Sequence, residues 1–332
     1  MKIIILCENT ENVSYVYPDN ILKELYKYGF NGQVYSKKDV LENAELFADT
    51  EYIFSTWGMP SFDEDEIERC FPNLKCVFYA AGTVQGFARP FINCGVKVFS
   101  AWAANAVPVA EYTVSQIILA NKGFFLTSRI FKGKDHAVAR ETSGNYRGNY
   151  GVSVGIIGAG MIGKLVIKML KVYKLNLKVF DPFLPDDVAT ELGVQKVSLE
   201  EIFSTCTVVS NHLANNEQTK NILDYKLFSL MPEYATFLNT GRGAQVVEAD
   251  LIKHLEERPD VMAILDVTAP EPPLDDSKLY TLENCILTPH IAGSSGDEVH
   301  RMAEFMIEEF KNYRENILCK YEVTEKMLAT MA

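Results

Sequence analysis

The stretch Val152–Asp181 constrains the fold of this chain more than any other part of the sequence. A short apolar run, Val152–Ile157, is followed by Gly158-Ala159-Gly160-Met161-Ile162-Gly163 and by an apolar pattern of helical spacing through Leu170. A second apolar run, Leu175–Phe180, ends in Asp181. The order of strand, glycine turn, helix, strand and acid predicts a βαβ unit that binds its ligand at the glycine turn.

Each glycine of this turn has a physical role in binding a dinucleotide. Gly158 permits the tight turn, Gly160 lets the backbone approach a pyrophosphate, and Gly163 lets the helix pack close to the strand. The helix N-terminus offers free N–H groups and the positive end of its dipole to the phosphates. A purely structural glycine turn is the alternative, and the complete strand–helix–strand context favours the dinucleotide site.

The acid at the end of the second strand indicates which dinucleotide binds. Asp181 can accept hydrogen bonds from both ribose hydroxyls, and it would repel a 2′-phosphate. Pro182 stands where such a phosphate would favour Arg or Lys. NAD is therefore the expected cofactor, and NADP is less favoured.

The length and the charge of the chain limit the classes of protein to which it can belong. A chain of 332 residues, 48% hydrophobic and 23% charged, has the size of about two globular domains. The net charge of −12 argues against nonspecific binding to nucleic acid or to anionic membranes, because like charges repel. It leaves room for a local positive pocket that binds a small anion.

Cysteine usage and the N-terminus indicate a cytoplasmic protein. Seven scattered cysteines without a CxxC pair are typical of reduced thiols, and their spacing predicts neither a disulfide framework nor a metal site. The run Met1–Leu6 is too short for a signal peptide and reads as a strand. No apolar run reaches membrane-spanning length.

Two successive sets of alternating strands and helices follow from the sequence pattern. The strands expected in the first hundred residues are Lys2–Leu6, Gln33–Tyr35, Tyr52–Ser55, Leu74–Tyr79 and Val96–Phe99, with helices at Pro18–Tyr28, Lys38–Phe47 and Asp63–Cys70. The strands expected later are Val152–Ile157, Leu175–Phe180, Val194–Val197, Thr207–Asn211, Ala235–Asn239, Val261–Asp266 and Cys285–Thr288. This alternation predicts two doubly wound parallel sheets covered by helices, an α/β fold.

Three further segments join or end these sets. Ala106–Lys122 has helical spacing and is expected to cross into the second domain. Lys132–Asn149 is polar and is expected to be an exposed arm or loop that contacts a partner subunit. Glu298–Glu315 reads as a long amphipathic helix.

Two strands of the first sheet end in loops of small or aromatic residues, Trp57-Gly58 and Ala81-Gly82-Thr83. Ligands of open α/β sheets bind at the carboxyl ends of strands, and a small-residue turn can direct successive N–H groups at an anion. A plain connecting turn is an equally good reading of either loop.

Three strands of the second sheet are followed by reactive side chains, namely Arg242, Glu271 and His290. Reduction of a 2-keto acid needs a fixed cation for the carboxylate, and a guanidinium binds it bidentately. It also needs a proton donor such as His, and a carboxylate that orients this His and favours its charged form. Taken singly, each residue has a plain reading: a solvated loop arginine, an exposed turn glutamate and a structural histidine.

Several ordered motifs together resemble the D-isomer-specific 2-hydroxyacid dehydrogenase family. They are the glycine turn with Asp181, VAEYT at 109–113, NTGRG at 239–243, DVTAPEP at 266–272 and TPHIAG at 288–293. The resemblance implies two Rossmann- or flavodoxin-like domains that flank a cleft: a discontinuous substrate-binding domain, 1–101 with 298–332, and an NAD-binding domain, 102–297. It also implies a homodimer built on the NAD-binding domain.

By the family pattern, Arg242 binds the substrate carboxylate, His290 is the general acid and base, and Glu271 orients His290. The expected cofactor-binding residues are Gly158, Gly160, Met161, Ile162, Gly163, Asp181, His212, Thr240, Asp266 and Gly293. Asp266 could instead be a strand-end cap or support for the site. The expected substrate-binding residues are Trp57, Ala81, Gly82, Thr83 and Arg242.

The sequence also departs from the family pattern. Tyr79-Ala80 replaces an Arg that phosphoglycerate-type members often have, which disfavours a phosphorylated substrate. Ala214-Asn215 replaces a proline-containing turn after His212. We expect an NAD-dependent oxidoreductase that interconverts a small 2-keto acid and its D-2-hydroxy acid. An NADH-sensing binding protein, or an NAD enzyme for another small anion such as formate, are the alternatives.

Overall fold

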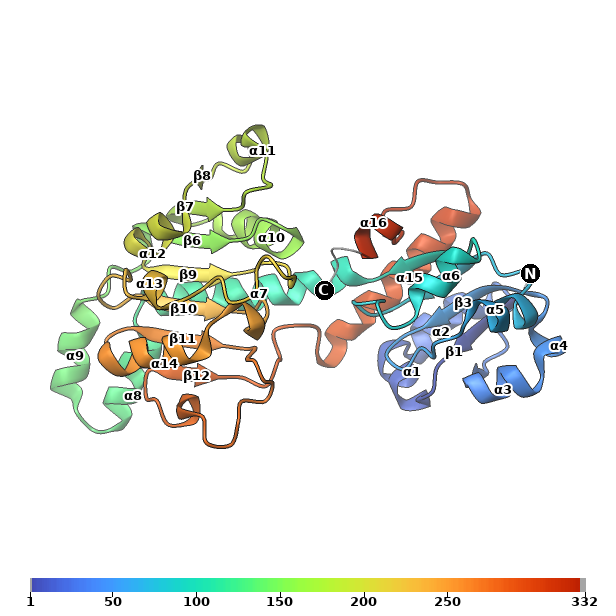
Figure 1. Ribbon diagram of the computed structural model, residues 1–332, viewed down its shortest axis with the longest axis horizontal. Coiled ribbons are helices and arrows are strands. Elements are labelled where there is room, and N and C mark those ends of the chain that lie inside the picture. Colours follow the sequence, from blue (N-terminus) through green and yellow to red (C-terminus); the bar gives the residue numbers. More distant parts are fainter. Residues whose placement is uncertain (1, 329–332) are drawn as a thin grey trace. The chain divides into compact units, whose positions relative to one another are not determined.

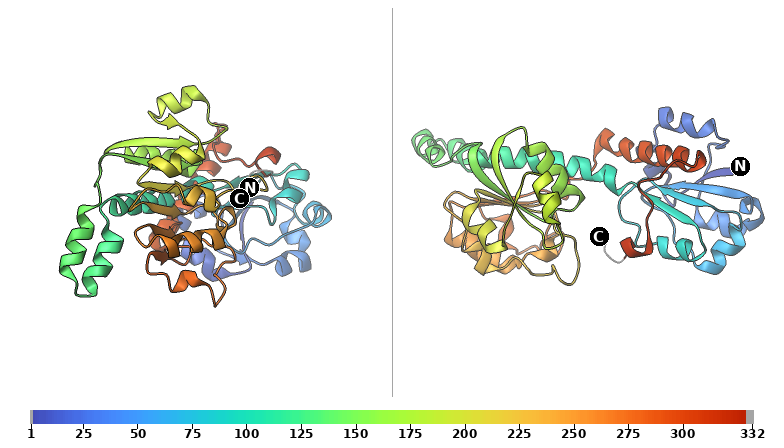
Figure 2. Two further views of the ribbon diagram at one scale, coloured as in Figure 1. Left: turned by 60° about the vertical axis from the view of Figure 1, so that its left-hand side comes forward. Right: turned by 90° about the horizontal axis from the view of Figure 1, so that it is seen from above.

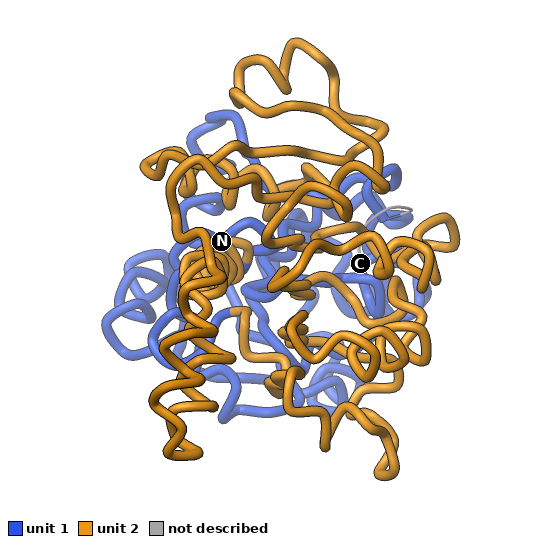
Figure 3. Tube along the Cα trace, turned by 90° about the vertical axis from the view of Figure 1, so that its left-hand side faces the viewer, with its two compact units in different colours: residues 1–105, 294–332 blue, residues 106–293 orange. Residues whose placement is uncertain are grey.

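The computed structural model describes residues 2–328, and the chain divides into two compact units (Figure 3). Unit 1 comprises residues 1–105 and 294–332, and unit 2 comprises residues 106–293. Residues 1 and 329–332, which the sequence assigns to the first domain, lie outside the described residues. The predicted boundaries, after residues 101 and 297, each lie four residues from those of the units.

Unit 1 is built on a five-stranded sheet in which all paired strands are parallel. Its strands are β1 (Lys2–Leu6), β2 (Val34–Tyr35), β3 (Thr50–Ser55), β4 (Cys76–Tyr79) and β5 (Lys97–Ser100). They lie in the order β2-β1-β3-β4-β5 (Figure 1). Parallel strands need helical crossovers, so helices cover both faces.

The helices of unit 1 bury alternate residues of each strand. The helices are α1 (Thr10–Val16), α2 (Asp19–Tyr26), α3 (Lys37–Glu42), α4 (Ala44–Phe47), α5 (Glu64–Cys70), α6 (Ala88–Asn93), α15 (His300–Arg314) and α16 (Glu325–Leu328). Ile3 and Ile5 of β1 pack in one core with α1, α2 and α15. Ile4 and Leu6 pack in the other, with α3 to α6 and α16. This period of two is the expected signature of a strand that is buried on both faces.

Helix α15 belongs to unit 1 although it comes from the C-terminal part of the chain. Phe310 is fully buried, and its ring meets Tyr52, Phe54 and Phe78 edge to face. A short 3₁₀ helix, η3 (Gly296–Val299), precedes α15. Unit 1 is therefore discontinuous in sequence.

Unit 2 is built on a seven-stranded parallel sheet. Its strands are β6 (Tyr150–Ile157), β7 (Lys174–Phe180), β8 (Gln195–Lys196), β9 (Val208–Asn211), β10 (Thr236–Asn239), β11 (Met262–Leu265) and β12 (Cys285–Leu287). Their order is β12-β11-β10-β9-β6-β7-β8 (Figure 1). The strand order reverses between β6 and β9. Ligands of such sheets bind at this reversal, beyond the carboxyl ends of the strands.

Two layers of helices sandwich this sheet. The helices are α7 (Trp102–Asn121), α8 (Phe124–Lys132), α9 (His136–Gly144), α10 (Met161–Leu170), α11 (Asp186–Glu191), α12 (Leu199–Thr205), α13 (Tyr225–Phe228) and α14 (Glu248–Glu257), with the 3₁₀ helices η1 (Gly243–Gln245) and η2 (Lys278–Tyr280). Helices α7, α10 and α11 share one core, and α12, α13 and α14 share the other. The predicted α/β class with two parallel sheets is thus confirmed.

The structure corrects three of the expected elements. The helix expected over Lys38–Phe47 is interrupted at Asn43, whose backbone is not helical (φ −132°, ψ 40°), so it forms α3 and α4. The segment 132–149 is not simply a loop, since it contains α9, and α8 and α9 stand off unit 2 as a helical pair (Figure 2). The helix expected at Ala106 starts at Trp102.

The described part of the chain, residues 2–328, contains no helix that is both long and apolar enough to cross a membrane. In the same residues no three His, Cys, Asp or Glu side chains are grouped so that they could hold a metal ion.

The glycine turn packs β6 tightly against α10. A Cβ added at Gly163 would lie 2.0 Å from the carbonyl oxygen of Gly158, and Gly158 itself has a φ of +91°. A Cβ at Gly160 would meet nothing within 4 Å. Close helix–strand packing therefore depends on Gly163, whereas Gly160 leaves open space beside the turn.

This difference gives a stability prediction. Gly163→Ala should lower the free energy of unfolding by about 3 kcal/mol, because the new methyl group forces α10 away from β6. Gly160→Ala, the matched control, should change it by less than about 0.5 kcal/mol. Urea unfolding followed by circular dichroism measures both, and equal midpoints for the two variants would contradict the packing argument.

Candidate active site

The three reactive side chains that the sequence singled out follow three neighbouring strands. Arg242 follows β10, Glu271 follows β11 and His290 follows β12. Strand β11 pairs in parallel with both β10 and β12. The three following loops therefore leave the sheet at the same edge.

His290 and Glu271 form a direct pair. Nδ1 of His290 lies 2.7 Å from Oε1 of Glu271, and both side chains are close to half exposed. The contact fixes the ring of His290, and it leaves Nε2 as the nitrogen that can exchange a proton with a ligand. This arrangement is the base-and-orienter pair of general acid–base chemistry.

Asp266 holds the loop that carries His290. Its buried carboxylate accepts hydrogen bonds from the backbone N–H groups of Ile291 and Ala292, both at 2.9 Å, and from the hydroxyl of Thr288 at 2.6 Å. The backbone N–H of His290 donates to the Asp266 carbonyl at 3.1 Å. These bonds stabilise His290 at a φ of +54°, which is unfavourable for a residue with a side chain.

The contacts of Asp266 bear on its predicted role. Its carboxylate accepts three hydrogen bonds from the segment 288–292, so the geometry supports the reading of Asp266 as support for the His290 loop. Its expected contact with the cofactor stays a prediction, as does that of Gly293, the last residue of unit 2.

Arg242 is available for an anion. Its Nη1 donates to the carbonyl oxygen of Gly241 at 2.8 Å, and its side chain is partly exposed. Among residues 2–328, no acidic side chain forms an ion pair with it. A guanidinium held at the carboxyl edge of the sheet can bind a small carboxylate bidentately.

His212 lies in a buried chain of hydroxyl groups. Its Nε2 lies 2.9 Å from Ser210 Oγ, and its Nδ1 lies 3.3 Å from Thr240 Oγ1, which lies 3.2 Å from Thr113 Oγ1. Burial lowers the pKa of His212 from 6.5 to about 3, because no charged group compensates the lost hydration of the imidazolium. His212 is therefore neutral at physiological pH and is unsuited to proton transfer.

The glycine turn has the features that a dinucleotide requires. Met161 and Ile162 are the first residues of α10, where N–H groups lack an intrahelical acceptor, and Gly160 leaves the open space described above. Asp181 accepts from the N–H of Ala159 at 2.7 Å and of Phe183 at 2.8 Å, so its carboxylate is fixed beside the turn. These residues fit a bound dinucleotide.

The predicted substrate residues other than Arg242 lie in unit 1. The hydroxyl of Ser100 donates to the carbonyls of Ala81, at 3.0 Å, and Gly82, at 2.5 Å, which fixes the direction of the turn that continues into Thr83. Trp57 is partly exposed, and its carbonyl accepts from Asn12 Nδ2 at 2.8 Å. Their contact with a substrate stays a prediction.

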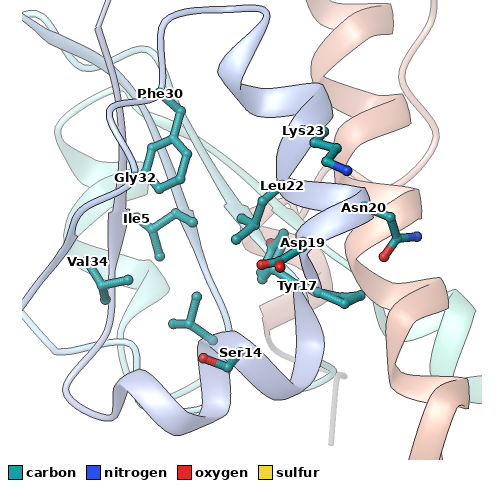
Figure 4. A pocket seen from close by; sticks show the side chains of 12 residues that line it. Ile5, Ser14, Tyr17, Asp19, Asn20, Leu22, Lys23, Phe30, Gly32 and Val34 are labelled. Carbon is teal, nitrogen blue, oxygen red and sulfur yellow. The ribbon is translucent and has the colours of Figure 1, made fainter.

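Unit 1 also contains a pocket of about 670 Å³ (Figure 4). Ile5, Tyr17, Leu22 and Phe30 contribute apolar walls, and Asp19 and Lys23 belong to the same lining. None of the predicted site residues lines it.

Sequence reasoning missed three buried amide side chains beside Arg242. They are Asn211, Asn239 and Gln245, each at most 1% exposed. The available signal was an Asn as the last residue of two fully buried strands, β9 and β10.

The low pKa of His212 predicts a pH dependence of stability. Between pH 6.5 and 3 the unfolded chain binds a proton at His212 that the folded chain does not, so stability falls as the pH drops through 6.5. From pH 7.5 to 5.0 the wild type should lose about 2 kcal/mol more than His212→Asn. Urea unfolding at the two pH values measures this. The exposed control His136→Asn should behave as the wild type, and equal losses for wild type and His212→Asn would contradict the prediction.

Comparison with known proteins identifies the family. Residues 115–292 match the family described as D-isomer specific 2-hydroxyacid dehydrogenase, NAD binding domain. The chain is 34% identical over 205 residues to the Bacillus subtilis protein YoaD, across 60% of this chain and 59% of that one. It is 31% identical over 218 residues to D-3-phosphoglycerate dehydrogenase of Methanocaldococcus jannaschii, across 65% of this chain and 40% of the relative. These matches span less than two thirds of the length of either relative.

A solved structure shows the same fold. A phosphoglycerate oxidoreductase from Rhizobium etli matches with a TM-score of 0.82 at 19% identity, covering 98% of this chain and 99% of that one. The family match covers more than half of the 332 residues and confirms the resemblance seen in the sequence. The chain therefore belongs to the D-isomer-specific 2-hydroxyacid dehydrogenases, and residues 115–292 match their NAD-binding domain.

Proposed function

We propose that this protein reduces a small 2-keto acid to its D-2-hydroxy acid with NADH, and that it catalyses the reverse oxidation with NAD. The observation that carries the proposal is the 2.7 Å contact between His290 and Glu271, which lie on neighbouring loops at the carboxyl edge of the unit 2 sheet. Asp266 holds the loop of His290. The glycine turn begins at the end of β6 in the same sheet.

The proton is assigned to His290. When bound, the dihydronicotinamide supplies a hydride to C2 of the keto acid, and the carbonyl oxygen gains a proton as its bond order falls. Nε2 of His290 gives this proton, because Nδ1 is engaged by Glu271. Glu271 stabilises the charged imidazolium before transfer and holds the ring in one orientation. In the reverse direction, His290 accepts the hydroxyl proton.

Arg242 is assigned to the substrate carboxylate. A guanidinium is a planar cation whose N–H groups match the geometry of a carboxylate. That of Arg242 has no acidic partner among residues 2–328. A substrate carboxylate bound there would hold the adjacent carbonyl group in a single orientation. The turn Ala81–Thr83 and Trp57 are proposed as further substrate-binding residues.

NAD is proposed over NADP because of Asp181. The carboxylate is fixed by Ala159 N–H and Phe183 N–H at the end of β7. An adenosine 2′-phosphate at this position would meet a negative charge, whereas ribose hydroxyls would meet a hydrogen-bond acceptor. The remaining predicted cofactor contacts, Thr240 and His212 among them, are proposed to line the nicotinamide side without reacting.

The function is tested with a panel of glyoxylate, hydroxypyruvate, pyruvate and longer 2-keto acids, each with NADH and with NADPH. Loss of cofactor absorbance is expected with at least one acid and faster with NADH. His290→Ala should lower kcat by about a hundredfold to ten-thousandfold, because the proton donor is lost. The affinity for NADH, measured by fluorescence, should change less than about threefold.

Other outcomes would contradict the proposal in distinct ways. An unchanged kcat for His290→Ala would remove this residue from its role. Oxidation of formate with NAD, with no keto acid consumed, would select the reading as an enzyme for another small anion. Stable association with a partner that NADH releases, without turnover, would select a sensing protein.

We also propose that the protein is a homodimer built on unit 2. Helices α8 and α9 form a pair that stands off the unit (Figure 2), and they expose the apolar side chains of Phe124, Phe131 and Val138. Exposed apolar groups of this kind are usual at protein interfaces. A second copy of the chain would cover them.

Sedimentation equilibrium tests the dimer. The wild type should have twice the 37.3 kDa mass of the chain. Phe131→Asp should shift the equilibrium toward the monomer, because a charge would be buried in the interface. Leu318→Asp, at an exposed position of unit 1, is the control. A wild-type protein that sediments as a monomer would overturn this proposal.

A further inference from the structure

Three buried amide side chains form one connected network beside Arg242. Asn211 is the last residue of β9, Asn239 is the last residue of β10, and Gln245 ends η1. Nδ2 of Asn211 donates to Oδ1 of Asn239 at 3.0 Å and to Oε1 of Gln245 at 2.5 Å. The network thus ties the ends of two neighbouring strands to the turn that follows Arg242.

Two members of the network hold the backbone of Arg242 on both sides. Oε1 of Gln245 accepts from the N–H of Arg242 at 3.2 Å, and Nδ2 of Asn239 donates to its carbonyl at 3.2 Å. Oδ1 of Asn239 also accepts from the N–H of Gly241 at 3.0 Å. A Cβ at Gly241 would lie 2.9 Å from both Asn211 Nδ2 and Gln245 Oε1, so glycine leaves the space that the amides occupy.

The same network holds the turn that follows His212. Nε2 of Gln245 donates to the carbonyls of Leu213, at 2.7 Å, and Ala214, at 3.0 Å. Oδ1 of Asn211 accepts from the N–H of Leu213 at 3.3 Å. The turn at 213–214, which lacks proline, is therefore fixed by side chains, and it is linked to the Arg242 turn through Gln245.

The cost of burying amide groups indicates that this network does more than fill space. Burying an amide is unfavourable unless its polar atoms are bonded, and apolar residues could fill the same space without that penalty. All six amide oxygen and nitrogen atoms of the three side chains are hydrogen bonded. A fully bonded buried network specifies one arrangement of the groups that it joins.

We propose that Asn211, Asn239 and Gln245 are positioning residues that fix the backbone of Arg242 relative to the turn at Leu213–Ala214, so that the guanidinium is held ready to bind the substrate carboxylate. The inference rests on the proposed function, since it concerns the Arg242 that this function uses. The three residues act through Arg242 and do not touch the substrate.

Gln245→Met tests the inference, because methionine keeps the length of the side chain and loses all of its hydrogen bonds. With the 2-keto acid that the wild type reduces fastest, KM should rise at least tenfold while kcat falls less than threefold. The affinity for NADH should change less than threefold. Asn211→Leu removes the same network from its other end and should give the same pattern, which keeps the test decisive if one variant does not fold.

Asn284→Leu is the matched control. Asn284 is also buried, and its Nδ2 donates to the carbonyls of Leu255, Arg258 and Val261. It lies at the amino end of β12, whereas Arg242 lies beyond the carboxyl end of β10. This variant should lower the melting temperature and leave KM within twofold of the wild type. If Gln245→Met also leaves KM within twofold, the network is structural only and the inference is overturned.

A second measurement separates this inference from the proposed function. If the wild type reduces none of the keto acids, the proposed function fails, and hydrogen exchange of residues 239–245 then decides the inference. Gln245→Met should speed exchange of the Arg242 amide at least tenfold relative to Asn284→Leu, because this N–H donates to Oε1 of Gln245. Equal exchange in the two variants would overturn the positioning role.

Discussion

The parallel sheet of unit 2 determines where the glycine turn and the loops of Arg242, Glu271 and His290 lie. Seven parallel strands send every carboxyl-terminal loop to one edge, and the strand order reverses between β6 and β9. The glycine turn after β6 and the loops after β10, β11 and β12 therefore leave the sheet on the same side. The chemistry follows from this topology, because residues more than a hundred positions apart in sequence reach one edge.

At that edge, the loops that carry the candidate catalytic side chains are held by buried neighbours. Asp266 binds the loop of His290, and the buried amides Asn239 and Gln245 bind the backbone of Arg242. These supports are buried, whereas the side chains of His290 and Glu271 are exposed. The buried side chains thus fix the loops, and the loops carry side chains that a ligand can reach. A site for binding and proton transfer needs this arrangement.

Much of this architecture could be predicted from the sequence. Strand positions were predicted to within two residues, because buried parallel strands are short apolar runs. Strand β7 ends at Phe180, so Asp181 follows it as expected. The break of a helix at Asn43 could not be predicted, since Asn is tolerated at helix ends and in loops alike. Helix α9 was missed because its polar sequence resembles that of an exposed loop.

The residues of the candidate site could also be predicted only in part. Arg242, Glu271 and His290 stood out because each followed an apolar strand, and the structure pairs two of them. The bonds among Asn211, Asn239 and Gln245 could not be predicted, because they join three separate segments and the sequence around an amide does not indicate its hydrogen-bond partner. Local patterns predict helices and strands, whereas hydrogen bonds between distant segments can be seen only in the folded structure.

The central claim is that a hydride reaches C2 of a 2-keto acid on the face that yields the D-hydroxy acid, while His290 delivers the proton. The most direct measurement is the reduction of a 2-keto acid with NADH in which both hydrogens at C4 of the nicotinamide are deuterium, followed by chiral separation and mass spectrometry of the product. The expected product is the D-isomer with deuterium at C2. A product without deuterium at C2, or the L-isomer, would contradict it.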